Sequence, residues 1–238
     1  MAVELKTISL KSNVQLKTRN NPKSIFYIGV KRFFDVVLSL CGLVLLSPVL
    51  LIAALLIFIE DGRPIIYVQT RVGKDKRRFQ MYKFRSMYMD AEERKKELMA
   101  QNKVSDGMMF KMDFDPRIIG NKILPDGTKK TGIGQLIRKT SIDELPQFWN
   151  ILKGDMSLVG TRPPTLDEWE KYEPHHRARM SFRPGLTGLW QVSGRSNITD
   201  FEEVVKLDTQ YINEWSVKND LRIIFQTAIS IMKKDGAM

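Results

Sequence analysis

Two adjacent carboxylates, Asp143 and Glu144, are the side chains in this sequence best suited to catalysis. An ionised aspartate can attack phosphorus as a nucleophile, and a neighbouring glutamate can hold Mg²⁺, which prefers oxygen ligands and often also binds substrate phosphates. Arg138 precedes the pair and would favour the ionised form of both acids. The ordinary alternative is a capping box, in which Ser141 and Glu144 satisfy the first turn of a helix. The two interpretations are compatible, because a helix start also stabilises a carboxylate.

Two glycine-containing loops could bind an anionic ligand. Residues 154–164 present Arg162 directly before Pro163, and arginine suits two-point recognition of phosphate. Residues 183–195 contain Gly185, and glycine lets a backbone approach a ligand closely. Either loop can equally be an ordinary surface turn. Neither contains a GKS or GKT sequence or a GxGxxG sequence, so a P-loop or a Rossmann site has no support.

Residues 82–87, with the sequence YKFRSM, interleave Lys83 and Arg85 with aromatic side chains. An anionic lipid headgroup is a natural partner for such a segment beside a membrane. The alternative is simple anchoring, in which long cationic side chains reach toward headgroups without contacting a substrate.

An uncharged segment of 24 residues, 36–59, is long enough to cross a bilayer as one helix. Both flanks are basic, because residues 1–32 and residues 71–85 each carry seven Lys or Arg against one acid. Since cytoplasmic flanks attract Lys and Arg, both ends are expected on one side of the membrane. Ser47 and Pro48 lie at the centre and predict a kink, with the Ser47 hydroxyl satisfying a freed carbonyl. We therefore expect a re-entrant helix; a kinked span and a buried soluble helix are the alternatives.

Composition restricts the classes of function. The net charge is +11, but residues 86–238 contribute only +1. A nucleic-acid binder usually carries its charge on the folded body, so no nucleic-acid partner is expected. The single cysteine excludes an intramolecular disulfide, and two adjacent histidines, His175 and His176, argue against a zinc site of the usual Cys/His type.

The expected fold class is α+β, mainly helical, with a re-entrant membrane helix and a cytoplasmic globular domain that contains a small β-hairpin. Residues 1–30 are predicted to form a basic arm, residues 31–60 the membrane helix and residues 61–238 the globular domain. Lys31 and Arg32 are expected to anchor the helix at lipid headgroups. Periodicity and turn residues predict strands at 65–69 and 79–84, a loop or hairpin over 115–135, and helices at 91–101, 142–152, 166–180, 201–215 and 221–232.

Five blocks, in this order, strongly resemble the bacterial sugar transferase family, the monotopic phosphoglycosyl transferases: KRFFDVVLSLCGLVLLSP, YKFRSM, RKTSIDELPQ, NILKGDMSLVGTRP and RPGLTGLWQVSGR. The resemblance covers residues 31–236. It implies a re-entrant helix broken at Ser47-Pro48, with Asp143 as the covalent nucleophile and Glu144 helping to hold Mg²⁺. Family positions that contact substrate fall on Lys83, Arg85, Arg138, Arg162, Pro163, Arg183 and Gly185.

The sequence departs from the family pattern at two places. The family loop usually reads Pro-Arg-Pro, whereas Thr161 stands first here, which puts the rigidity of the loop in question. A long stretch rich in glycine and lysine occupies residues 119–134, and its role is open. Longer family members carry additional membrane helices upstream, so this chain resembles a catalytic core without that module.

The resemblance implies transfer of a hexose-1-phosphate from a UDP-sugar to undecaprenyl or another polyprenyl phosphate, with release of UMP, at the start of exopolysaccharide or capsule synthesis. It places the chain in the bacterial inner membrane, with the catalytic domain on the cytoplasmic face, membrane lipids as partners and Mg²⁺ as cofactor. The long segment around residues 90–135 favours glucose or galactose over N-acetylated sugars, and the oligomeric state, a homodimer included, is open. The rival function is a non-catalytic, membrane-anchored partner of a glycan assembly system that binds anionic lipid.

Overall fold

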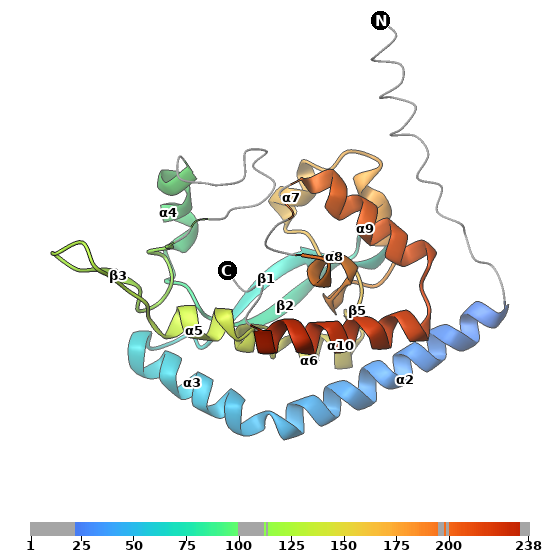
Figure 1. The fold of residues 1–238 in the computed structure, drawn as a ribbon, viewed down its shortest axis with the longest axis horizontal. Helices are drawn as coiled ribbons and strands as arrows, with labels where there is room; N and C mark the ends of the chain where they lie inside the picture. The colour runs from blue at the N-terminus through green and yellow to red at the C-terminus, as the bar shows by residue number, and fades with distance from the viewer. Residues whose placement is uncertain (1–21, 100–111, 113, 195–197, 199, 234–238) are drawn as a thin grey trace, which may run out of the picture.

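Two long helices, α2 (Pro22–Leu45) and α3 (Ser47–Asp61), form a wide V along one side of the molecule, and the other elements lie inside it (Figure 1). The structure, a computed structural model, describes residues 22–99, 112, 114–194, 198 and 200–233. The predicted basic arm at residues 1–21 lies outside these ranges. Residues 22–30 are helical, so the arm predicted there is instead the first part of α2.

The V results from a bend of 60° between α2 and α3. Pro48 has no N–H for the carbonyl of Val44, four residues earlier, and the Ser47 hydroxyl donates to that carbonyl at 2.8 Å. The helix break predicted at Ser47-Pro48 is thereby confirmed. Among the described residues no single helix is long and apolar enough to span a bilayer, although the bent pair together has the length and composition.

The outer and inner faces of this helix pair differ in character. The outer face exposes large apolar side chains, among them Phe33, Leu40, Leu45, Leu51, Leu55 and Ile59. On the inner face of α3, Ala53 and Ile57 are buried against Phe84, at the end of the first β-hairpin, and against α5 (Ile133–Lys139). The inner face of α2 instead carries Lys31, Asp35 and Ser39, which recur every four residues and are all buried.

The polar face of α2 attaches the helix to the domain. The Nζ atom of Lys31 donates to Oδ2 of Asp220 at 2.5 Å, and Asp35 accepts from the hydroxyl of Ser157 at 3.0 Å. Arg32 donates to two backbone carbonyls of α6 (Gln147–Lys153). The prediction that Lys31 and Arg32 anchor lipid headgroups is therefore wrong. Their side chains point to the domain because they share the inner face of α2.

The predicted hairpin is confirmed as β1 (Ile66–Val72) and β2 (Arg78–Phe84), antiparallel and joined through a 3₁₀ turn, η1 (Lys74–Lys76). Arg85 follows β2 and is buried, with its guanidinium on the end of α3. It contacts Oδ2 of Asp61 at 2.8 Å and donates to the carbonyls of Asp61 and Gly62. Arg85 thus fastens the hairpin to the helix pair.

Two further strand pairs are small. The strands β3 (Lys122–Ile123) and β4 (Lys129–Lys130) form an exposed hairpin inside the predicted range 115–135. The strands β5 (Ser157–Val159) and β6 (Gly185–Thr187) pair in parallel. A Cβ on Gly185 would collide with the backbone of Gly160, so this glycine is explained by close contact between strands. A contact between Gly185 and a ligand stays a prediction.

Two predicted helices are each divided. The helix predicted at 142–152 is a 3₁₀ turn, η3 (Ile142–Glu144), followed by α6, because Pro146 separates them. The helix predicted at 166–180 is α7 (Leu166–Glu170) followed by η4 (His176–Ser181). Pro174 lies between them and prevents continuous helical hydrogen bonding.

Three of the remaining helices confirm the predicted pattern: α4 (Ala91–Leu98), α9 (Phe201–Asn213) and α10 (Val217–Lys233). A short helix, α8 (Leu189–Val192), lies in the stretch at 183–195 that was predicted as a loop. Tyr211 of α9 and Ile223 of α10 pack with Trp215 and Val159 in one of the apolar clusters of the domain. The described residues are thus mainly helical with three two-stranded sheets, so the α+β class is confirmed.

Candidate active site

Asp143 and Glu144 lie in η3, the short turn between α5 and α6. Ser141, which precedes the turn, has a left-handed backbone (φ 56°) and makes no capping hydrogen bond through its side chain. The capping-box interpretation is therefore wrong. Asp143 is buried, with 7% of its surface exposed, so the local chain holds the carboxylate in place instead of leaving it in solvent.

The first cation at this turn is Lys83 of β2. Its Nζ atom lies 3.2 Å from Oε1 of Glu144, and both side chains are partly buried. An ion pair shielded from water in this way is stronger than one on the surface. The structure thus brings together three of the predicted site residues, Lys83, Asp143 and Glu144.

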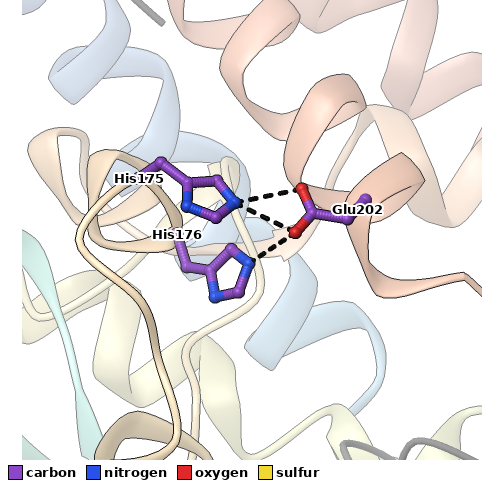
Figure 2. A group of neighbouring side chains, drawn as sticks. All are labelled: His175, His176 and Glu202. Atoms are coloured by element: carbon purple, nitrogen blue, oxygen red, sulfur yellow. Dashed lines mark hydrogen bonds and ion pairs between the residues drawn. The ribbon is translucent and has the colours of Figure 1, made fainter. Parts of the chain in front are cut away.

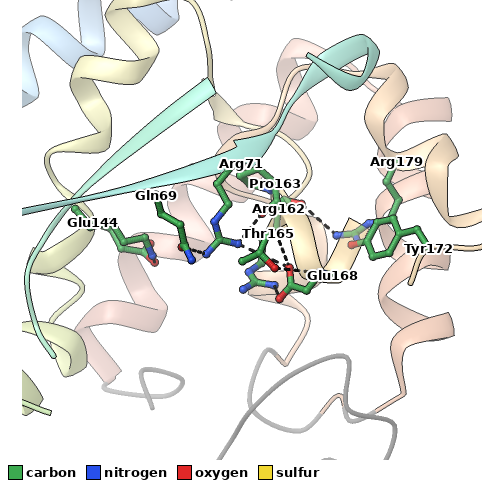
Figure 3. Close-up of polar contacts among 10 residues, drawn as sticks. Gln69, Arg71, Glu144, Arg162, Pro163, Thr165, Glu168, Tyr172 and Arg179 are labelled. Atoms are coloured by element: carbon green, nitrogen blue, oxygen red, sulfur yellow. Dashed lines mark hydrogen bonds and ion pairs between the residues drawn. The ribbon is translucent and has the colours of Figure 1, made fainter. Parts of the chain in front are cut away.

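Two arginines from other segments, Arg71 and Arg162, lie within electrostatic reach of Glu144, and Figure 3 shows Gln69 and Arg71 between Glu144 and Arg162. Arg162 comes from the loop after β5, and its Nη1 atom lies 3.4 Å from Oε1 of Glu168 on α7. Arg71 comes from β1 and donates through Nη1 to the carbonyl of Pro163 at 3.0 Å. Its other terminal nitrogen donates to the side chain of Gln69 at 2.6 Å. The β1–β2 hairpin therefore supports the loop that carries Arg162.

The charges of this group perturb one another. Burial lowers the pKa of Arg71 to about 10, with a further contribution from the positive charge of Arg162. Burial alone would raise the pKa of Glu168, but Arg162 and Arg71 outweigh that effect and hold its pKa below the ordinary value. The negative charge of Glu168 in turn raises the pKa of Arg162. Two like charges kept close in this way suit a strongly anionic ligand.

Hydrogen bonds of two buried residues, Arg179 and Thr161, fix the backbone of the Arg162 loop. Arg179 is fully buried; it donates to Oδ2 of Asp208 at 2.7 Å and to the hydroxyl of Tyr172 at 2.5 Å. It also donates to the carbonyl of Arg162 at 3.4 Å, as Figure 3 shows. Thr161 is buried and donates to the carbonyl of Arg179 at 3.0 Å. Thr161 stands where the family usually has proline, and this hydrogen bond holds the loop in place without that proline.

The other predicted contacts lie at different places. Arg138 ends α5, one turn before η3, and its Nε atom is buried with no hydrogen-bond partner in the described part of the chain. Burial and the positive charge of Arg32 on α2 lower the pKa of Arg183. Arg85 is bonded to the end of α3. As substrate contacts these three residues stay predictions, and Arg138 has the open donor that such a contact needs.

Sequence reasoning missed Arg71, Gln69 and Glu168. A signal existed for Glu168, because Thr165 and Glu168 have the spacing of a capping box, and the structure contains that box. Arg71 was counted only within a basic cluster, since nothing local shows that a strand residue meets a loop about 90 positions later. Tertiary contacts of this kind carry no sequence period.

The carboxylates of this site fit Mg²⁺ by the chemistry of their donors. Asp143 and Glu144 are adjacent and supply oxygen ligands, and Mg²⁺ in phosphate-binding sites usually takes one or two carboxylates together with the substrate. Lys83 contacts Glu144 from one side through Oε1. Glu144 is accordingly the residue that would hold the ion.

A separate cluster, His175, His176 and Glu202, has side chains within metal-ligating distance of one another (Figure 2). The Nε2 atoms of both histidines lie 2.9 to 3.1 Å from the carboxylate of Glu202. However, Nδ1 of His176 accepts the backbone N–H of Glu173 at 3.1 Å, so the ring proton is on Nε2. Since a metal ligand needs an unprotonated nitrogen, these contacts are better explained as hydrogen bonds that tie α9 to the preceding loop.

Comparison with known proteins defines the class. The family model of the bacterial sugar transferases matches residues 26–234, which is most of the chain. The protein therefore belongs to the bacterial sugar transferase family.

Three relatives illustrate what the chain is similar to. It is 53% identical over 211 residues to a galactosyl transferase of Streptococcus agalactiae, covering 89% of this chain and 44% of the relative. It is 42% identical over 225 residues to an undecaprenyl-phosphate galactose phosphotransferase of Salmonella typhimurium. This match covers 93% of this chain and 44% of the relative. A third relative, from Aeromonas hydrophila, is a UDP-N-acetylgalactosamine–undecaprenyl-phosphate N-acetylgalactosaminephosphotransferase. It is 36% identical over 219 residues, which cover 90% of this chain and 46% of the relative. The chain thus spans about half the length of each.

Proposed function

We propose that the chain transfers a hexose-1-phosphate from a UDP-sugar to undecaprenyl or another polyprenyl phosphate, releasing UMP. The product would start a repeat unit of exopolysaccharide or capsule. The observation that carries the proposal is the carboxylate pair of η3: Asp143 is buried, and Glu144 forms an ion pair with Lys83 and lies within electrostatic reach of Arg71 and Arg162. A nucleotide diphosphate is the kind of ligand that such an arrangement neutralises, and the family membership supports the same reaction.

The first step is a displacement at the phosphorus that carries the sugar. An oxygen of Asp143 attacks this phosphorus, and a bond from Asp143 to phosphorus forms. The bond from the same phosphorus to the bridging oxygen breaks, and UMP leaves with that oxygen. Arg162 and Arg71 offset the charge of the diphosphate, and the ion pair with Lys83 orients Glu144. A magnesium ion held by Glu144 would supply further positive charge at the phosphates.

The second step regenerates the carboxylate. An oxygen of the polyprenyl phosphate attacks the phosphorus, and the bond to Asp143 breaks. The lipid now carries a diphosphate linked to the sugar. Burial of Asp143 limits access of water to the intermediate, so transfer to lipid is favoured over hydrolysis.

We also propose that α2 and α3 enter and leave the cytoplasmic face of the inner membrane as a re-entrant pair. Three features support this placement: the apolar outer face, the 60° bend and the basic residues on both flanks. It puts the site at the boundary where a soluble donor meets a lipid acceptor.

The donor we propose is UDP-galactose. Two relatives of higher identity are named for galactose, whereas the Aeromonas relative at 36% identity is named for N-acetylgalactosamine. UDP-glucose is the second choice because the two hexoses differ only in the configuration at one carbon.

The test uses purified protein in nanodiscs with undecaprenyl phosphate, Mg²⁺ and a panel of UDP-sugars, with UMP and lipid-linked sugar both measured. We expect UMP release with one hexose donor, loss of both products in Asp143→Asn, and loss on chelation of Mg²⁺. Folded protein that forms neither product with any donor would overturn the proposal. The non-catalytic lipid-binding function would then explain the basic flanks instead.

A further inference from the structure

A pocket of about 590 Å³ lies where the β3–β4 hairpin and α5 meet the end of α3. Its walls include Lys122 and Lys130 of the hairpin, Lys139 of α5 and Glu60 of α3. In Figure 1 the hairpin projects beside the end of α3, apart from the β1–β2 hairpin. No residue of the carboxylate and arginine group lines this pocket, so it is separate from the candidate active site.

The pocket is positively charged and its cations are available. Three lysines face one acid among the lining residues. Lys122, Lys130 and Lys139 are all exposed, and none of them forms an ion pair with another described residue. Three ammonium groups held by two separate elements around a hollow form a site for an anion and not only a charged surface.

Exposed apolar side chains border the same pocket. Ile59 is 69% exposed on the neighbouring face of α3, and Leu136 of α5, itself a lining residue, is 56% exposed. A ligand that satisfies these surroundings must combine a negative headgroup with a hydrocarbon chain. A soluble nucleotide or free phosphate would leave the apolar border in water.

We propose that this pocket binds the phosphodiester headgroup of an anionic bilayer phospholipid, with its acyl chains along the outer face of α3. The proposal rests on the membrane placement given under the proposed function. It assigns a role to the stretch at 119–134, which no part of the transfer reaction uses. The lysines hold the headgroup, and the bound lipid secures α5, the helix that leads directly into η3 and Asp143.

The test is native mass spectrometry of the full chain in detergent, titrated with phosphatidylglycerol or phosphatidylcholine. A triple variant, Lys122→Gln, Lys130→Gln and Lys139→Gln, removes the three cations. The matched control, Lys96→Gln, Lys206→Gln and Lys218→Gln, loses the same charge at exposed positions outside both basic flanks. Each lysine near a lipid surface contributes about fivefold to binding, so the triple variant should bind phosphatidylglycerol at least ~10-fold more weakly than wild type.

We expect wild type and the control to prefer phosphatidylglycerol to phosphatidylcholine, and the triple variant to lose this preference while keeping its melting temperature. Equal binding of the two lipids, or an unchanged preference in the triple variant, would overturn the proposal. Undecaprenyl phosphate is the third titrant: if the triple variant loses only this ligand, the pocket belongs to the acceptor and the phospholipid proposal fails. Asp143→Asn should bind phosphatidylglycerol as wild type does, so this result stands apart from the transferase test.

Discussion

Glu168 is the residue on which the cationic side of the candidate site depends. Arg71 and Arg162 would repel each other at this distance, and the carboxylate of Glu168 lies between them, 3.7 Å from one guanidinium and 3.4 Å from the other. The capping box with Thr165 fixes the orientation of Glu168 in turn. We therefore expect Glu168 to act as a positioning residue for Arg162.

Glu168→Gln should lower kcat/KM for UMP release by about 10- to 100-fold, because displacement of a positioned charge by about an ångström can cost that much. Glu170→Gln, on the exposed side of the same helix, is the matched control and should react as wild type does. Steady-state UMP release with the preferred donor measures both. Equal activity of Glu168→Gln and wild type would show that Arg162 does not need this partner.

The lowered pKa of Glu168 also predicts how stability depends on pH. Because its folded pKa lies below the ordinary value of 4.5, ionised Glu168 stabilises the fold at pH values above 4.5. That contribution should be lost as the pH falls through the lowered pKa. The difference in melting temperature between wild type and Glu168→Gln should therefore be full at neutral pH and shrink below pH 4.5. A difference that is constant down to pH 3 would contradict the ionised state assigned here.

At the scale of elements, α2 is joined to the domain by a buried polar network. Asp220 of α10 accepts from Lys31 at 2.5 Å, from the hydroxyl of Tyr211 at 2.7 Å and from Nε1 of Trp215 at 3.1 Å. One carboxylate thus unites α2, α9 and α10. Any movement of α2 would have to break this network, so the helix pair and the domain are expected to move together.

Asp220→Asn should destabilise the protein by about 3–5 kcal/mol, because it leaves the ammonium of Lys31 buried without its counter-charge. The double variant Lys31→Met, Asp220→Leu removes both charges and should recover a large part of the loss. Denaturant unfolding in detergent measures each variant, with Asp167→Asn as an exposed control. If the double variant is no more stable than Asp220→Asn, the unpaired charge of Lys31 is not the cause of the destabilisation.

The success of sequence reasoning differed between elements for physical reasons. The break at Ser47-Pro48 and the β1–β2 hairpin were predictable, since proline chemistry and turn residues act locally. Lys31 was misassigned, because a cation beside an apolar run looks the same whether it meets lipid or a buried carboxylate. The spacing of Lys31, Asp35 and Ser39 by four was a usable sign of an inner polar face. The contact of Arg71 with Glu168 could not be predicted, since it depends on the packing of distant segments, although the capping-box spacing marked Glu168 itself.

For the whole molecule, the proposed membrane placement implies that the bend of the helix pair decides which side of the membrane the N-terminus occupies. Without the proline, residues 36–59 could continue as one helix of sufficient length to cross the bilayer. Pro48→Ala should therefore move part of the N-termini to the opposite side. The basic flank opposes this movement, so a mixed population is expected.

A cysteine placed at Ala2, with Cys41→Ser to remove the exposed native thiol, reports this topology. An impermeant maleimide applied to intact cells should leave the protein with Pro48 unlabelled and should label part of Pro48→Ala. Labelling of both proteins to the same extent would mean that the pair spans the membrane despite its bend.

In the proposed reaction, Asp143 becomes covalently linked to the sugar phosphate. The most direct measurement is mass spectrometry of the protein after incubation with its UDP-sugar and Mg²⁺ in the absence of polyprenyl phosphate. We expect a mass increase of one hexosyl phosphate on the peptide that contains Asp143, absent in Asp143→Asn and removed when polyprenyl phosphate is added. Turnover of donor and acceptor without this adduct, in protein quenched during the reaction, would rule out the covalent intermediate and indicate direct transfer between the two substrates.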